Sequence, residues 1–101
     1  MATCQPVIPP HIAEVIRSFP PDLKRSVKAA VRALSEDPNL GEPLLKELKG
    51  HWKYRVRRFR IVYTVHRRNK VIRIVAVGHG RRVYEDLSVE LIQRRISERA
   101  R

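Results

Sequence analysis

The chain has 101 residues, of which 43% are apolar, and it carries a formal net charge of +12 at pH 7. This length suits one small domain with a modest core, and the lack of a long apolar run excludes an ordinary membrane-spanning helix. A single cysteine, Cys4, excludes an internal disulfide and a cysteine-based zinc site. We therefore expect one soluble domain over residues 1–101, without a leader peptide, located in the cytoplasm and needing no metal or other cofactor.

The positive charge is concentrated in the second half of the chain. Residues 1–50 hold seven Lys or Arg and six Asp or Glu, whereas residues 51–101 hold fifteen and four. Between His51 and Tyr84 there are eleven Lys or Arg and no carboxylate. Such a one-sided field favours a polyanionic partner, through phosphate contacts and counterion release. The alternative is a basic face kept for solubility, but solubility alone needs no acid-free block.

The first half of the chain predicts one short strand and two helices. Pro6–Ile8 is the only candidate for a strand before the helices. Pro9 and Pro10 suit the first turn of a short helix. Its apolar face comprises Ile12, Val15, Ile16 and Phe19. A second helix is predicted from about Asp22 to Glu36, and Pro38 ends it. Its apolar stripe comprises Leu23, Val27, Ala30, Val31 and Leu34. We assign both apolar faces to the core.

Three strands follow in the second half. Alternation and apolar runs predict them over residues 51–57, Phe59–His66 and Val71–Val77. The third is apolar on almost both faces, as in a strand covered on both sides. The links at Arg57–Arg58 and Arg68–Asn69 are short enough for antiparallel hairpins, and Asn69 tolerates the left-handed backbone that such turns need.

A last helix is expected from about Ser88 to Arg99. It is interpreted as a terminal helix packed on the sheet, as a basic flank that touches RNA, or as a lid that a partner protein displaces. Together these elements predict an α+β fold in a small single domain. An N-terminal helical hairpin would pack on a twisted, mainly antiparallel sheet of three to four strands, with a C-terminal helix added.

If the first two long strands pair as a hairpin, their alternating pattern brings basic side chains together into a candidate site. A two-residue turn at Arg57–Arg58 predicts the pairs Val56 with Phe59, Tyr54 with Ile61 and Trp52 with Tyr63. This apolar ladder would pack on the helices. On the other face Arg55 lies directly opposite Arg60, with Lys53 one step along, and like charges so placed repel one another. With no acid expected nearby, the cluster indicates a site for a phosphate.

A glycine-flanked segment follows the third strand. Gly78 and Gly80 allow a sharp change of direction there. The segment carries His79, Arg81, Arg82 and Tyr84 to the end of the sheet. Cleavage of an RNA phosphodiester requires one group to deprotonate the 2′-hydroxyl, one to protonate the leaving 5′-oxygen, and cations to stabilise the phosphorane. The alternative interpretation is a loop histidine and a tyrosine that caps the core.

Residues 44–84 carry a series of motifs in a fixed order. These are Leu48–Lys49–Gly50 before the sheet, Lys53 and Arg55 in the first long strand, Phe59–Arg60 opening the next, Val77–Gly78–His79, and Tyr84. In this order they resemble the RelE/ParE toxin superfamily, in particular RelE-like mRNA interferases. The resemblance implies a toxin of a type II toxin–antitoxin system. It also implies a ribosome-dependent endoribonuclease that cleaves mRNA in the A site by metal-free attack of the 2′-hydroxyl and so inhibits translation.

The resemblance implies roles for individual residues. Lys53 and Arg55 match the two basic positions that act as proton acceptor and phosphate contact, and Arg60 matches the arginine that stabilises the phosphorane. Tyr84 matches a tyrosine that stacks on or orients the substrate base. The proton donor usually follows Val-Gly-His directly, where this chain has Gly80. The candidates for the donor are Arg81, Arg82 and His79. Further RNA contacts are expected from Lys49, Arg57, Arg58, His79 and Arg82.

The resemblance also implies the partners. They are a cognate antitoxin whose acidic or amphipathic segment wraps the domain, the 70S ribosome, and mRNA. Operator DNA would be reached only through the antitoxin, and no membrane is involved. Two alternatives stay open: a ParE-like DNA gyrase inhibitor, which shares the fold but lacks the basic set, and a non-catalytic basic module that binds nucleic acid.

Overall fold

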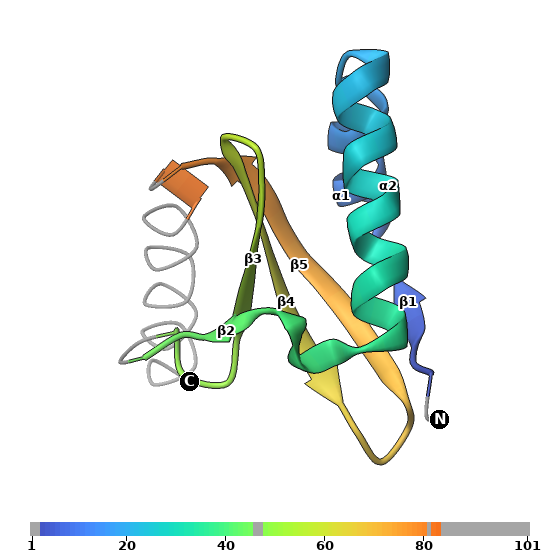
Figure 1. Cartoon of the computed structure of the whole chain (residues 1–101), viewed down its shortest axis with the longest axis vertical. Coiled ribbons are helices and arrows are strands. Elements are labelled where there is room, and N and C mark those ends of the chain that lie inside the picture. The colour runs from blue at the N-terminus through green and yellow to red at the C-terminus, as the bar shows by residue number, and fades with distance from the viewer. Residues whose placement is uncertain (1–2, 46–47, 81, 84–101) are drawn as a thin grey trace, which may run out of the picture.

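The computed structural model describes residues 3–45, 48–80, 82 and 83. Two helices, α1 (Pro10–Arg17) and α2 (Pro21–Glu36), lie side by side on one face of a sheet (Figure 1). Each helix begins with a proline, at a position where the missing N–H would have no partner in any case. The predicted helical hairpin is confirmed, whereas the helix expected at Ser88–Arg99 lies outside the described residues. None of the described helices has the length and hydropathy needed to cross a bilayer.

Five strands form one mixed sheet in the order β1-β5-β4-β3-β2. The strands are β1 (Gln5–Val7), β2 (Glu42–Pro43), β3 (Trp52–Val56), β4 (Phe59–His66) and β5 (Val71–His79). β1 runs parallel to β5, and the other neighbours are antiparallel. The α+β fold and the mainly antiparallel sheet are confirmed. The prediction of three to four strands missed β2, because a two-residue strand after the short 3-10 helix η1 (Pro38–Leu40) leaves no alternating pattern.

The main core lies between the helices and the sheet. The whole predicted stripe of α2 is buried, as are Ile12 and Ile16 of α1. From the sheet, the predicted ladder joins the same cluster through Val56, Ile61 and Tyr63. Val15 was expected to be buried but is 38% exposed. Because α1 spans about two turns, only the line through Ile12 and Ile16 faces the sheet, and Val15 lies beside it.

A smaller apolar cluster covers part of the opposite face of the sheet. Its buried members are Leu48, Val62 and Val83, and Leu44, Val75 and Ala76 pack against them. A register shift between Val62 and Tyr63 gives β5 one extra residue at this point, so that both Val75 and Ala76 pack against this cluster. Strict alternation would place only one of them there. This arrangement explains why β5 is apolar on both faces, as the sequence indicated.

Both hairpin turns place a cationic residue in left-handed backbone. Arg57 has a φ of 58° in the β3–β4 turn, and Lys70 has a φ of 55° in the β4–β5 turn. The expectation that Asn69 would take this conformation was therefore wrong by one residue. Glycine or asparagine adopts left-handed backbone with less strain than arginine or lysine does. The chain thus keeps a positive charge at each turn where a neutral residue would fit the backbone better.

Candidate functional site

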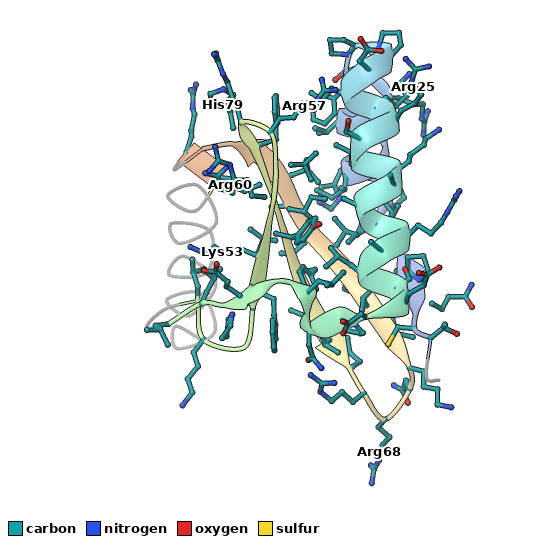
Figure 2. All side chains as sticks on the ribbon, in the orientation of Figure 1. Arg25, Lys53, Arg57, Arg60, Arg68 and His79 are labelled. Atoms are coloured by element: carbon teal, nitrogen blue, oxygen red, sulfur yellow. The ribbon has the colours of Figure 1, made fainter. Side chains whose placement is uncertain are left out.

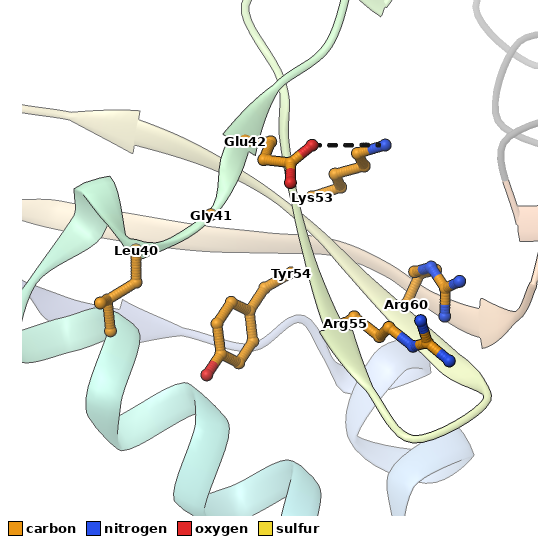
Figure 3. A pocket seen from close by; sticks show the side chains of 7 residues that line it. All are labelled: Leu40, Gly41, Glu42, Lys53, Tyr54, Arg55 and Arg60. Atoms are coloured by element: carbon orange, nitrogen blue, oxygen red, sulfur yellow. Dashed lines mark ion pairs between the residues drawn. The ribbon is translucent and has the colours of Figure 1, made fainter.

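A hollow of about 380 Å³ opens beside the β2–β3–β4 part of the sheet (Figure 3). Its lining residues are Leu40, Gly41, Glu42, Lys53, Tyr54, Arg55 and Arg60. One wall is the strap from η1 to β2, and the other is the β3–β4 hairpin. The hollow therefore brings together three of the five predicted catalytic residues. The other two, Arg81 and Tyr84, lie outside the described residues.

The β3–β4 hairpin places two arginines side by side. Arg55 and Arg60 are direct partners across the strands, in the predicted register. Figure 3 shows their guanidinium groups next to each other, while the ring of Tyr54 points toward the helices. Arg55 Nε donates to the carbonyl oxygen of Arg57 at 3.0 Å, and Arg60 Nη1 donates to that of Phe59 at 3.1 Å. These bonds orient both groups, and five N–H donors per guanidinium leave several for an anion.

Lys53 has an acidic neighbour that the sequence analysis did not foresee. The β2–β3 pairing sets Glu42 opposite Lys53, and Glu42 Oε2 lies 3.7 Å from Lys53 Nζ. The expectation of no acid near the cluster was therefore wrong. The Glu42 side chain is 77% exposed, so the ion pair adds little to stability. Among the described residues that line the hollow, one carboxylate stands beside three cations, a combination that suits a phosphate.

The strap is held in place by a buried tyrosine. Tyr63 is fully buried, and its hydroxyl donates to the carbonyl oxygen of Pro38 at 2.7 Å and accepts from the Gly41 N–H at 3.1 Å. Burial raises the pKa of Tyr63, and the bond from Gly41 offsets this only in part, so the hydroxyl is neutral and able to donate at pH 7. A Cβ on Gly41 would lie 2.4 Å from the Tyr63 hydroxyl and 2.5 Å from the Lys53 carbonyl oxygen, so only glycine fits there.

The remaining predicted site residues that the structure describes lie outside the lining of the hollow. Arg57 and Arg58 are exposed at the β3–β4 turn, and the Gly80 N–H donates to the Arg58 carbonyl oxygen at 3.0 Å. His79 pairs with Phe59 and meets its ring edge-on, with ring centroids 5.2 Å apart. Because Phe59 packs on the helix side, His79 belongs to that side and Arg60 to the opposite one.

Two further predicted RNA contacts, Lys49 and Arg82, are not among the residues that line the hollow. Lys49 is exposed in the turn before β3, at the other end of that strand from the β3–β4 turn. Arg82 is exposed beside the buried Val83, which contacts the Gly78 region. Among the described residues no group of three His, Cys, Asp or Glu side chains is placed to hold a metal ion. The cationic hollow is thus the part of the predicted site that the structure assembles.

A family model described as "ParE toxin of type II toxin-antitoxin system, parDE" matches residues 11–84. A search of curated proteins found no match. Three of the similar solved structures are toxins or toxin complexes from Mycobacterium tuberculosis, Escherichia coli and Agrobacterium tumefaciens.

The structural matches cover most of the domain. The RelBE2 toxin–antitoxin complex of M. tuberculosis matches with a TM-score of 0.72 and 23% identity, over 78% of this chain and 93% of that one. A free, doubly substituted E. coli toxin RelE matches with a TM-score of 0.71 and 19% identity, over 93% and 98%. The YoeB/ParE toxin of A. tumefaciens matches with a TM-score of 0.65 and 18% identity, over 74% and 96%. At these identities the structures establish a shared fold.

The fold and the family match together define the class of this protein as the RelE/ParE toxin superfamily, as the sequence motifs indicated. Within it, the chain belongs to the ParE toxin family of type II toxin–antitoxin systems. It is therefore a toxin of such a system.

Proposed function

We propose that this toxin is an endoribonuclease that cleaves mRNA in the A site of the ribosome. The observation that carries the proposal is the convergence of Lys53, Arg55 and Arg60 on one hollow. Two guanidinium groups side by side repel each other unless an anion lies between them, and a phosphodiester supplies that anion. A gyrase inhibitor has no need of such a cluster on the face of the sheet that points away from the helical hairpin.

In the proposed reaction the 2′-hydroxyl oxygen attacks the adjacent phosphorus and the bond from phosphorus to the 5′-oxygen breaks. The products are a 2′,3′-cyclic phosphate and a free 5′-hydroxyl. The proton of the 2′-hydroxyl passes to a proton acceptor in the hollow, the role proposed for Lys53, and a second proton passes to the leaving 5′-oxygen. Arg55 and Arg60 stabilise the negative charge that builds up on the phosphorane, which they do best when held in place in advance.

The proton donor and the base contact are assigned to residues near the end of β5. Arg81 and Arg82 follow the Gly80 turn and are the preferred donors, because His79 belongs to the helix side of the sheet. Tyr84 is proposed to orient the substrate base. Arg57 and Arg58, exposed at the β3–β4 turn, would contact phosphates next to the one that is cut.

We further propose that a cognate antitoxin restrains this toxin. Two of the matching structures, from M. tuberculosis and E. coli, are described as toxin–antitoxin complexes. A net charge of +12 favours an acidic antitoxin segment that covers the hollow in place of RNA. Operator DNA would be bound by the antitoxin and not by the toxin itself, and the site of action would be the cytoplasm.

Inhibition of DNA gyrase is the second candidate, and the match to a family model described as ParE toxin favours it. Induction of the toxin in growing cells separates the two functions. A nuclease produces new mRNA ends in translated regions, seen by primer extension, and does not trap gyrase on DNA. Trapped gyrase and DNA damage without mRNA cuts would replace the proposal by the second candidate. Nucleic-acid binding without either effect would indicate a non-catalytic basic module.

A further inference from the structure

The cationic hollow is larger than the single phosphate that its arginines suit. Its volume of about 380 Å³ lies within the usual range of pockets that hold small organic molecules. Lys53, Arg55 and Arg60 line one part of it, and Leu40 and Tyr54 line another. Figure 3 shows Leu40 and the ring of Tyr54 on one side of β3 and the two guanidinium groups on the other. The proposed reaction uses the cationic part and gives the apolar part no role.

Leu40 is a large apolar side chain that the hollow leaves open to water. It is 47% exposed, and among the described residues the other exposed large apolar side chains do not line the hollow. Tyr54 is half-buried against the main core and lines the hollow as well. A flat aromatic ligand can cover a leucine and a tyrosine ring together and so remove apolar surface from water. The apolar part of the hollow therefore suits a nucleobase.

The strand edge beside Leu40 offers main-chain hydrogen bonds. The Leu44 N–H, just after β2, donates to the carbonyl oxygen of His51, just before β3, at 2.9 Å. Main-chain groups of a strand point alternately to its two sides, so those of Lys53 and Arg55 face the β2 side as well. In the described chain β2 pairs with β3 as far as Lys53. The N–H and C=O of Arg55 therefore border the hollow, where a base can bond to both.

The place of Lys53 indicates which base would lie in this part of the hollow. Lys53 pairs with Glu42 of β2, next to the strap that carries Leu40, and it is proposed to accept the proton of the 2′-hydroxyl. That hydroxyl belongs to the nucleotide on the 5′ side of the bond that is cut. The proton donor is proposed near the end of β5, which β4 and β3 separate from β2 in the strand order. The 5′ nucleotide would therefore lie toward the strap and the 3′ nucleotide toward β5.

We infer that the apolar part of the hollow is a subsite for the base of the nucleotide that supplies the attacking 2′-hydroxyl. The base packs on Leu40 and Tyr54, and its edge exchanges hydrogen bonds with the N–H and C=O of Arg55. Every nucleobase carries a donor next to an acceptor on its pairing edge, so the subsite orients a base without selecting one. The assignment to the attacking nucleotide rests on the proposed nuclease function, whereas the subsite itself requires only that the hollow binds a nucleotide.

The test compares the binding of two oligomers that have no 2′-hydroxyl and cannot be cleaved by its attack. One is a DNA tetranucleotide, and the other is the same sugar–phosphate chain with an abasic site at every position. The ratio of their Kd values at low salt measures what the bases contribute to binding. The ratio is measured for wild type, Leu40→Ala and Leu45→Ala. Leu45 is the matched control, because it is 77% exposed and is not among the residues that line the hollow.

Wild type should bind the base-bearing oligomer roughly 5- to 50-fold more tightly than the abasic one. Leu40→Ala should reduce this ratio by roughly three- to tenfold, because a smaller side chain gives the base less apolar surface to cover. Leu45→Ala should keep the wild-type ratio, and circular dichroism should show both variants folded. In NMR spectra of wild type, the base-bearing oligomer should slow the exchange of the Arg55 amide hydrogen with solvent, and the abasic oligomer should not.

Cleavage of ribosome-bound mRNA tests which nucleotide uses the subsite. An abasic site on the 5′ side of the cut bond should abolish the difference in KM between wild type and Leu40→Ala. An abasic site on the 3′ side should preserve that difference. The reverse pattern would overturn the assignment to the attacking nucleotide.

The subsite would be overturned if wild type bound the two oligomers equally, or if Leu40→Ala and Leu45→Ala gave the same ratio of Kd values. An Arg55 amide that exchanges at the same rate with either oligomer would overturn the main-chain contact. Failure of the proposed function has a different signature: the wild-type toxin would leave ribosome-bound mRNA whole and still prefer the base-bearing oligomer through Leu40. That result would support the subsite as part of a nucleic-acid site without catalysis.

Discussion

Replacing Tyr63 by phenylalanine removes the hydroxyl that joins the core to the strap of the candidate site. The hydroxyl makes two hydrogen bonds, to the Pro38 carbonyl and from the Gly41 N–H. At about 1 kcal/mol for each bond, Tyr63→Phe should lower the free energy of unfolding by about 2 kcal/mol at pH 7. For a domain of this size that corresponds to a drop in Tm of roughly 8–16 °C. Urea unfolding followed by the fluorescence of Trp52, the one tryptophan of the chain, gives the free energy directly.

The same substitution has a signature in the pH dependence. Burial raises the pKa of Tyr63 above its ordinary value of 10.0, so above pH 10 the unfolded chain ionises this tyrosine while the folded chain does not. Wild type then loses stability by up to about 1.4 kcal/mol per pH unit from this group until the pH passes the folded pKa. Tyr63→Phe escapes that loss, so the stability gap between the two proteins should narrow above pH 10.

Tyr54→Phe is the matched control for this prediction. Tyr54 lies on the neighbouring strand, and within the described residues its hydroxyl makes no hydrogen bond. Its replacement should change stability by less than about 0.5 kcal/mol. The account of the strap would be refuted if the two variants were equally stable at pH 7. It would also be refuted if the gap between wild type and Tyr63→Phe stayed constant to pH 12.

Three further substitutions test the parts of the site. Glu42→Gln removes the carboxylate of the hollow and should tighten RNA binding roughly two- to fivefold in filter-binding assays; a hundredfold loss of cleavage would instead make Glu42 the proton acceptor. Gly41→Ala should lower the free energy of unfolding, measured by thermal unfolding, by about 2–3 kcal/mol, because the added methyl group would clash with the Lys53 carbonyl oxygen and the Tyr63 hydroxyl. Unchanged stability would contradict the close packing of Gly41 against these two groups. Arg57→Asn should raise the free energy of unfolding by about 1 kcal/mol, because asparagine adopts left-handed backbone with less strain. The same variant should reduce the salt slope of RNA binding by about one, because it loses one phosphate contact. A lower free energy of unfolding, or an unchanged salt slope of RNA binding, would count against the role given to Arg57.

The β3–β4 hairpin shows what could be predicted from the sequence. Alternation in residues 51–57 and a two-residue turn specify the register, because a slip by one residue would turn the whole apolar ladder to the solvent. The placement of Arg55 opposite Arg60 follows from that register, and the structure confirms it. The buried stripe of α2 could be predicted equally well, because the spacing of its apolar residues repeats over the full helix.

The strap could not be predicted from local pattern. Glu42 reaches Lys53 through a two-residue strand, and Tyr63 binds Pro38 and Gly41 across 25 and 22 residues of chain. Neither contact leaves a periodic signal, because both depend on how distant segments pack. The error at the β4–β5 turn has another cause: local preference favoured left-handed backbone at Asn69, but the turn placed it at Lys70.

The central claim is that the cationic hollow stabilises the transition state of RNA cleavage, and single-turnover cleavage of ribosome-bound mRNA by purified toxin tests it most directly. Wild type should leave 2′,3′-cyclic phosphate ends. Arg60→Gln should lower the cleavage rate by about 10²–10³ with the fold intact, whereas Arg32→Gln, which removes an exposed charge on α2, should cut like wild type. An Arg60→Gln toxin that cuts at the wild-type rate would contradict the claim, as would a wild-type toxin that binds programmed ribosomes and leaves the mRNA whole.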